Sequence, residues 1–156
     1  MKTRELQTLW WDWLGTSERL LRSLHEQTAA LTLRDVARVE RIQPEVAQLM
    51  ERMRSIDDKA AAFAQKLAAE MDTEPSLRGL VSVLEKAEAQ QVQQIANRVT
   101  VAARNVHHVI DKNRTLIENE MVYVNGTLTL IAKSATEAQG PYKPSAHAAV
   151  LVDQAA

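Results

Sequence analysis

Apolar residues recur at alternating steps of three and four along most of this chain, and this spacing constrains the fold more than any other feature. Such spacing puts apolar side chains on one face of a helix, which must then be buried against another helix. The sequence therefore predicts an all-α fold of long helices packed side by side. The clearest register is a heptad seam made of Val46, Leu49, Met53, Ile56, Ala60, Phe63 and Leu67.

The first two predicted helices occupy the N-terminal half of the chain. The first runs from Lys2 to Leu31, and we expect it to continue through residues 15–17, although Gly15 could bend it. A short segment, 32–42, follows, with Asp35 as the cap of a brief helix. A straight helix through Pro44 would lose about 3 kcal/mol, so Pro44 is expected to begin the second helix or to kink it.

The third predicted helix is much longer than the other two. It begins after a polar linker, residues 72–76, where Ser76 or Thr73 can cap it, and its apolar stripe continues to residue 133. A helix over residues 76–133 would span about 87 Å, roughly twice the length of the others. Half of it would then lack a partner within the chain, so a bend near residues 111–114, a second copy or another protein must cover it.

These elements predict an antiparallel bundle of three long, coiled-coil-like helices over residues 1–133, with an overlong C-terminal helix. Residues 134–156 hold Gly140, Pro141 and Pro144 and few charges, which indicates a mobile tail. One segment supports two structures. Asn125-Gly126 between β-branched runs is a hairpin signal, whereas the spacing of apolar residues across 121–131 fits a helix. We expect a helix, because a lone hairpin is marginally stable in water.

Composition excludes most chemistry. The chain has no Cys, so disulfides, thiolate metal sites and thiol nucleophiles are ruled out. Its net charge is −1 and the signs alternate, which argues against nucleic acid as a partner. No apolar run is long enough to span a membrane or to act as a secretory signal, so we expect a cytoplasmic protein without membrane insertion. No phosphate loop, nucleophile turn or di-iron motif is present, so we expect neither an enzyme nor a cofactor.

Two clusters of side chains are candidate sites. His107 and His108 are adjacent and point about 100° apart on a helix, so they cannot chelate one ion together. Trp10 and Trp13 fall on the buried face of the first helix, while Trp11 points elsewhere. We interpret the histidines as surface residues and the tryptophan pair as part of the core, and leave the role of Trp11 open.

A distinctive motif lies in the C-terminal third of the chain, where Asn113 is followed by Leu116-Ile117-Glu118, then by Met121, a Leu-rich helix and Tyr142 after a short polar stretch. On this motif, and in the architecture of the whole chain, the sequence resembles the FlgN family of flagellar export chaperones. The resemblance is specific from about residue 105 to 142, and the chain departs from the family pattern after Tyr142, where Lys-Pro-Ser replaces the usual Gly and Asp-Gly.

The resemblance implies a cytoplasmic chaperone of flagellar type III export. Its partners would be the C-terminal helical segments of the hook-associated junction proteins, which it would keep unassembled and deliver to the export gate. It further implies that Tyr142 contacts the export gate. The implied client-binding residues are Asn113, Leu116, Ile117, Met121, Val124, Leu128 and Ile131.

Two other functions fit the same pattern. The clean seam over residues 46–67 would suit a self-associating structural coiled coil, so a homo-oligomer is possible. A helical bundle with an exposed histidine would suit a phosphotransfer module, although Asp111 and Lys112 stand where such modules carry Lys and Gly after the histidine.

Overall fold

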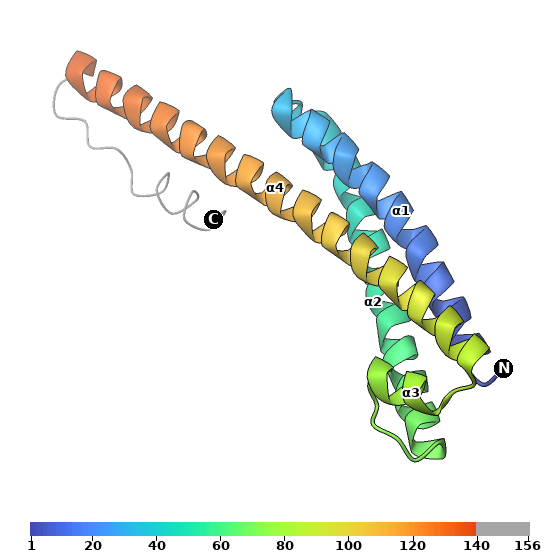
Figure 1. The fold of residues 1–156 in the computed structure, drawn as a ribbon. Coiled ribbons are helices and arrows are strands. Elements are labelled where there is room, and N and C mark those ends of the chain that lie inside the picture. The colour runs from blue at the N-terminus through green and yellow to red at the C-terminus, as the bar shows by residue number, and fades with distance from the viewer. Residues whose placement is uncertain (140–156) are drawn as a thin grey trace. The chain divides into compact units, whose positions relative to one another are not determined.

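The structure is a computed structural model that describes the backbone of residues 1–139 and the side chains up to residue 136. Four helices make up this part of the chain: α1 (Arg4–Thr32), α2 (Val36–Glu70), α3 (Leu77–Val83) and α4 (Lys86–Gln139) (Figure 1). Residues 1–139 contain no strand, so the predicted all-α bundle is confirmed. The chain divides into two compact units, Met1–Ile110 and Asp111–Ala156.

Helix α1 is continuous, as predicted, through the Gly15-Thr16-Ser17 step. Thr16 Oγ1 donates a hydrogen bond to the Asp12 carbonyl at 2.8 Å, and Ser17 Oγ donates to the Leu14 carbonyl at 2.7 Å. Both hydroxyls are therefore paired with carbonyl groups of their own helix, and they do not disrupt its backbone hydrogen bonds.

A tight turn joins α1 to α2. Arg34 takes the left-handed conformation, with φ of 55°, and the Asp35 amide donates to the Ala30 carbonyl at 2.9 Å. This six-to-one bond is the mark of a Schellman helix end. The Asp35 carboxylate then accepts from the Arg38 amide at 3.1 Å, which confirms Asp35 as the helix cap.

Pro44 lies inside α2 and neither begins it nor separates it from a brief preceding helix. The expectation of a separate segment over 32–42 was therefore wrong. Pro44 is exposed, and the turns on either side of it bury Ile42 and Val46 in the core. Burying two such side chains contributes about 3–6 kcal/mol, enough to offset the loss of roughly 3 kcal/mol that an internal proline causes.

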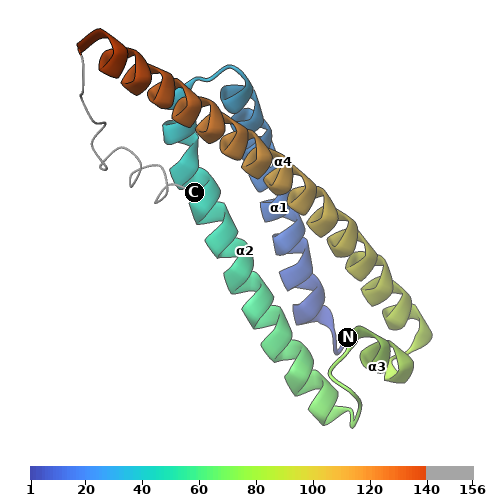
Figure 2. The same ribbon diagram turned by 90° about the vertical axis from the view of Figure 1, so that its left-hand side faces the viewer.

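The core of the first unit, Met1–Ile110, lies between α1, α2 and the first part of α4 (Figure 2). The predicted seam of α2 is confirmed as a buried face, so its partner helices lie within the chain. Trp13 is buried in this core and Trp10 packs against a second cluster around Leu6 and Leu80, whereas Trp11 is 49% exposed. The main cluster contains Trp13, Leu20, Leu24, Ala30, Ile42, Val46, Leu49, Met53, Ile56, Val106 and Val109.

The predicted long third helix is two helices. Ser76 caps α3 by accepting from the Gly79 amide at 3.0 Å, as expected, but Leu84 adopts an extended conformation and α4 starts only at Lys86. The break lets Leu80 of α3 pack with Leu67 and Ala68 of α2, while Glu88 of α4 reaches the start of α1. A single straight helix could not make both of these contacts.

Helix α4 contains 54 residues and its backbone stays helical through residues 111–114 and 121–131. The helical interpretation of 121–131 is therefore confirmed. The boundary between the two units falls at residues 110 and 111, where the sequence favoured a bend. Residues 134–139 belong to α4, and the rest of the predicted tail lies outside the described residues.

A buried polar contact joins the start of α1 to the start of α4. The Thr3 amide and hydroxyl both donate to Glu88 Oε1, at 2.8 and 2.6 Å. Burial works against the ionisation of Glu88, but the two hydrogen bonds from Thr3 and the positive charges of the N-terminus and Lys2 outweigh it and lower the pKa of this carboxyl. From this contact α1 and α4 run in the same direction through the first unit, and α2 runs antiparallel to both (Figure 2).

Candidate functional site

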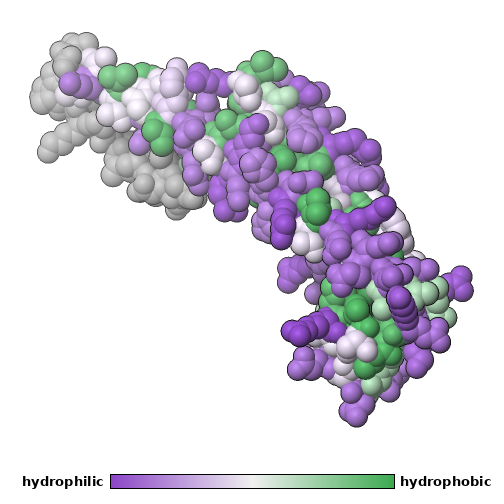
Figure 3. Space-filling view, in the orientation of Figure 1, coloured by the Kyte–Doolittle hydropathy of each residue, from purple (hydrophilic) through white to green (hydrophobic). Residues whose placement is uncertain are grey.

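The C-terminal part of α4 carries the most unusual surface in the described chain. From Met121 to Ala132 the helix has no charged residue, although Glu118, Glu120 and Lys133 flank this stretch. A surface helix ordinarily confines its apolar side chains to one face and carries charges on the other. Figure 3 shows hydrophobic side chains on the surface over this part of α4.

From Ile117 to Ile131 all the large apolar side chains are exposed rather than packed, except that of Met121, which is half-buried like that of the neighbouring Leu116. Their exposed fractions run from 39% for Ile117 to 73% for Val122. A single exposed apolar residue is normal on any protein, but a contiguous group marks an interaction surface. We call this group the α4 stripe: Ile117, Met121, Val122, Tyr123, Val124, Leu128, Leu130 and Ile131.

Five of the residues expected from the resemblance share one face of the stripe. Steps of four, three, four and three residues connect Ile117, Met121, Val124, Leu128 and Ile131, so they line up along the helix. On this face Met121 is half-buried and the other four residues are exposed. Leu116, which lies beside the face, is also half-buried. Asn113, in contrast, is only 2% exposed. Tyr142 lies outside the described residues.

Three exposed residues of the stripe, Val122, Tyr123 and Leu130, were not among the expected site residues. They lie on the other sides of the helix, so a search for a single apolar face passes over them. The signal that could have found them is the absence of charge over residues 121–132, which concerns the whole circumference of the helix rather than one face.

The threonines of this stretch add little polar surface. Thr127 Oγ1 donates to the Tyr123 carbonyl at 3.0 Å, and Thr129 Oγ1 donates to the Asn125 carbonyl at 2.9 Å. Their donors are therefore used within the helix. The chemistry that this surface offers is contact with another apolar surface, with few polar groups that must be desolvated or paired.

No metal centre or membrane span accompanies the stripe. In the part of the chain that the structure describes, no three His, Asp or Glu side chains come together as metal ligands. Among the same residues, no helix combines the length and the apolar character needed to cross a bilayer.

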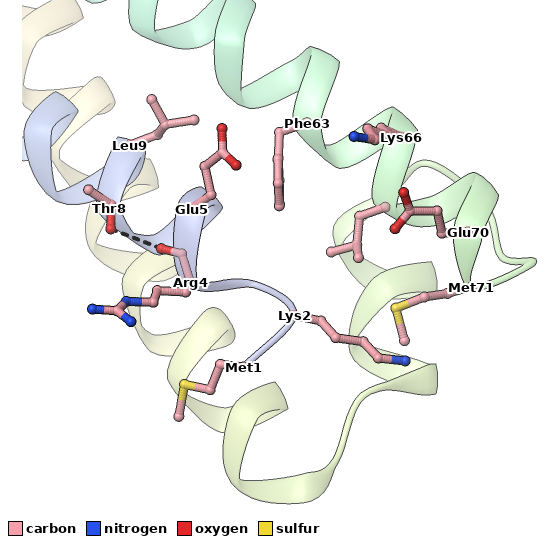
Figure 4. A pocket seen from close by; sticks show the side chains of 11 residues that line it. Met1, Lys2, Arg4, Glu5, Thr8, Leu9, Phe63, Lys66, Glu70 and Met71 are labelled. Atoms are coloured by element: carbon pink, nitrogen blue, oxygen red, sulfur yellow. Dashed lines mark hydrogen bonds between the residues drawn. The ribbon is translucent and has the colours of Figure 1, made fainter.

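A separate cleft of about 660 Å³ lies in the first unit, between the start of α1 and the end of α2 (Figure 4). Leu9, Phe63 and Met71 give it an apolar lining, and charged side chains of both signs surround them: Lys2, Arg4, Glu5, Lys66 and Glu70. Its size falls within the usual range of ligand pockets. The mixture of charges, however, defines no single class of ligand, and none of the expected site residues lies there.

Comparison with known proteins gives one match. The family model described as FlgN protein matches residues 1–149, which is nearly the whole chain and covers the first unit and most of the second. No curated protein and no solved structure matches the chain.

Proposed function

The chain belongs to the FlgN family of flagellar export chaperones, and we propose that its clients are the hook-associated proteins of the hook–filament junction. In this proposal the chaperone acts in the cytoplasm and binds the C-terminal helical segments of its clients. It keeps them from assembling too early and delivers them to the type III export apparatus.

The observation that carries this proposal is the α4 stripe. A client segment that is unfolded before assembly can form an amphipathic helix and lay its apolar face on exposed apolar side chains. The face through Ile117, Val124 and Ile131 presents such side chains over roughly 21 Å, or about four turns of helix.

Binding of this kind explains chaperone action without a cofactor. The client surface that packs on the stripe is the surface that would otherwise drive its own polymerisation, so occupation of the stripe masks it. Release needs no hydrolysis, because competition by the export apparatus for client or chaperone suffices. Tyr142 is the proposed contact with the export gate.

The test is titration calorimetry of the full chain with C-terminal segments of hook-associated proteins. Leu128→Asp and Ile131→Asp each put a charge on the proposed face, and we expect each to weaken binding by about tenfold or more. Thr129→Asp is the matched control, because it adds the same charge to the same exposed stretch but off that face. Wild-type chain that binds no such segment, or stripe variants that bind as wild type does, would contradict the proposal.

The proposed role of Tyr142 needs a separate measurement. We expect Tyr142→Ala to leave the affinity for the client segment unchanged and to reduce binding of the loaded chaperone to export-gate components. A variant that lowers both affinities equally would place Tyr142 in the client site instead.

A further inference from the structure

The α4 stripe has two faces. The front face is the line of residues on which the proposed function places the client: Ile117, Met121, Val124, Leu128 and Ile131. Each residue of an α-helix turns the chain by about 100°, so residues two positions apart lie nearly opposite each other. Gly126 and Leu130 are each two positions from Leu128 and therefore lie on the opposite side of the helix. We call this side the back face: Val122, Tyr123, Gly126 and Leu130.

The back face is open to solvent along its length. Val122 is 73% exposed, Leu130 is 66% exposed and Tyr123 is 54% exposed. A Cβ placed at Gly126 would meet nothing within 4 Å. A single client helix on the front face would leave all of these apolar groups in water, so the back face needs a cover of its own.

Polar side chains separate the two faces on both sides of the helix. Glu118, Asn125 and Thr129 follow one border, and Glu120 and Thr127 follow the other. A helix that packs on one neighbour has one apolar face, with polar residues over the rest of its surface. Two apolar faces between two polar borders are typical of a helix that lies between two neighbours.

Gly126 gives the back face a gap that suits a packed helix. Residues 123, 126, 127 and 130 have the spacing i, i+3, i+4 and i+7, which forms the hole for one side chain of a neighbouring helix. Because Gly126 has no side chain, this hole has room for a large apolar residue, with Tyr123 and Leu130 beside it. In the absence of a partner, the glycine only weakens the helix, by about 1 kcal/mol relative to alanine.

Charge on the back face defines the chemistry of its partner. Lys133 follows Leu130 by three positions, so it lies at the C-terminal end of this face, and its side chain is exposed. From Val122 to Leu130 the face carries no charge. The helix that fits it has an apolar side toward α4 and an acidic residue opposite Lys133.

We propose that the client binds as two helices, one on the front face and one on the back face. The C-terminal part of α4 then becomes the central helix of a three-helix bundle. This inference rests on the proposed function, because the occupant of the back face is a second helix of the same client segment. A single segment that supplies both helices binds the second face as an intramolecular step, which favours it over two separate partners.

The lengths of the two faces set the length of the client segment. The front face spans about four turns of helix, and the back face with Lys133 spans about three. Helices packed on opposite sides of α4 have axes about 16–20 Å apart, a distance that a linker of about six residues crosses. The segment therefore needs roughly 30–35 residues. A piece of it that holds only one of the two helices should bind at least about tenfold more weakly.

Titration calorimetry of the full chain tests the back face, with a C-terminal segment of a hook-associated protein, about 40 residues long, as the probe. We expect Leu130→Asp to weaken binding by about tenfold or more, as Leu128→Asp does on the front face. Asn125→Asp is the matched control, because it adds the same charge at an exposed position on the polar border between the faces, with little change in size. It should bind as wild type does.

Gly126→Leu separates packing from helix stability. The new side chain fills the hole on the back face, so we expect binding to weaken by about tenfold. Leucine also favours helix, so the helix content of the free chain should rise, as far-UV circular dichroism measures. Weaker binding by a more helical chain cannot result from a loss of helix.

Reversal of the charge at Lys133 tests the acidic residue of the client. We expect Lys133→Glu to weaken binding by about threefold, because an exposed ion pair is replaced by two like charges. Lys59→Glu makes the same change at an exposed position of α2 and should leave the affinity unchanged.

The absence of Cys from the chain permits a direct test of coverage by thiol alkylation. Leu128→Cys and Leu130→Cys place single thiols on the front and back faces. In the free chain both should react quickly with a maleimide, and in the complex with a Cys-free client segment both should react at least about tenfold more slowly. Ala61→Cys, at an exposed position of α2, should react at the same rate in both states.

Failure of this inference is distinguishable from failure of the proposed function. A wild-type chain that binds no client segment overturns both. If Leu128→Asp weakens binding but Leu130→Asp does not, or if Leu130→Cys reacts equally fast in the complex, the client covers the front face alone and only this inference is overturned.

Two other results would assign the back face to a different occupant and would also overturn the inference. Slow alkylation of Leu130→Cys in the free chain would assign it to another part of the same chain. A complex that contains two chaperone copies for each client segment, measured by sedimentation equilibrium, would assign it to a second copy. The expected complex contains one copy of each.

Discussion

Gly79 and Gly126 differ in what surrounds them, although both lie in helices. A Cβ at Gly79 would lie 2.5 Å from the Glu74 carbonyl oxygen, because the linker before α3 passes close to this residue. A Cβ at Gly126 would meet nothing within 4 Å. The same substitution is therefore expected to have opposite effects at the two positions.

We expect Gly79→Ala to destabilise the chain by about 1–3 kcal/mol, because backbone must move to admit the methyl group. Gly126→Ala should stabilise helix α4 locally by about 1 kcal/mol. Chemical unfolding measures the first effect, and far-UV circular dichroism with amide exchange measures the second. A stabilising Gly79→Ala would mean that the linker does not pack as described.

Glu88 is expected to make stability depend on acid pH. Its pKa is lower in the folded chain than in the unfolded chain, so its stabilisation is complete above the unfolded pKa and is lost as the pH falls through the folded pKa. Glu88→Gln should cost about 1–3 kcal/mol at neutral pH and should remove this part of the acid sensitivity. Urea unfolding at a series of pH values checks both, with the exposed Glu85→Gln as control.

At the residue scale, the sequence indicates helix starts better than helix ends. Asp35 and Ser76 could be predicted as caps, because their side chains accept backbone hydrogen bonds. The ends of α1 and α2 use Arg34 and Asp72 in the left-handed conformation, with φ of 55° and 51°. Glycine usually marks such an end, so nothing in the sequence singled out these positions.

At the scale of elements, α4 is one helix with two environments. Before residue 110 it buries Val92, Ile95, Val106 and Val109 in the first unit, whereas over residues 117–131 its large apolar residues, apart from the half-buried Met121, are exposed. Helical hydrogen bonds that lack tertiary packing open more readily than those in a core. The helix therefore should not be equally stable along its length.

Amide hydrogen exchange should show this difference. In the free chain we expect slow exchange over residues 92–109 and fast exchange over 117–131, because only the first stretch is held by packing. Addition of a client segment should slow the second stretch and leave the first unchanged. Uniform protection along α4 without a client would contradict this description of the stripe.

The continuity of α2 at Pro44 and the break between α3 and α4 could not be predicted from the sequence. Pro44 indicated a helix boundary, yet burial of Ile42 and Val46 on either side keeps α2 continuous. No glycine or proline at Leu84 indicates the break there. The break follows from the tertiary contacts of Leu80 and Glu88, which no local sequence pattern encodes. The candidate site was easier, because its apolar spacing is local. The burial of Asn113 could not be foreseen.

At the scale of the whole molecule, the core and the α4 stripe belong to different units. The core cluster of α1, α2 and the first part of α4 lies within Met1–Ile110, and the stripe lies within Asp111–Ala156. Changes in the stripe are therefore expected to alter binding without altering the stability of the first unit. Changes in the core are expected to do the opposite.

The three tryptophans make this separation measurable, because all of them lie in α1. Thermal unfolding followed by tryptophan fluorescence therefore reports on the first unit. Leu128→Asp should change its stability by no more than about 0.5 kcal/mol, whereas Leu20→Ala should lower it by about 2–5 kcal/mol. A large loss in Leu128→Asp would mean that the two units unfold as one.

The contact between Thr3 and Glu88 also orders the events of folding. It closes a loop of 85 residues, whereas the turn between α1 and α2 brings neighbouring segments together at little entropic cost. The α1–α2 hairpin should therefore form in the transition state, and the Thr3–Glu88 contact only after it. Loss of that contact should leave the folding rate nearly unchanged and accelerate unfolding. This one hydrogen-bonded carboxylate therefore helps to set the lifetime of the folded chain before it unfolds.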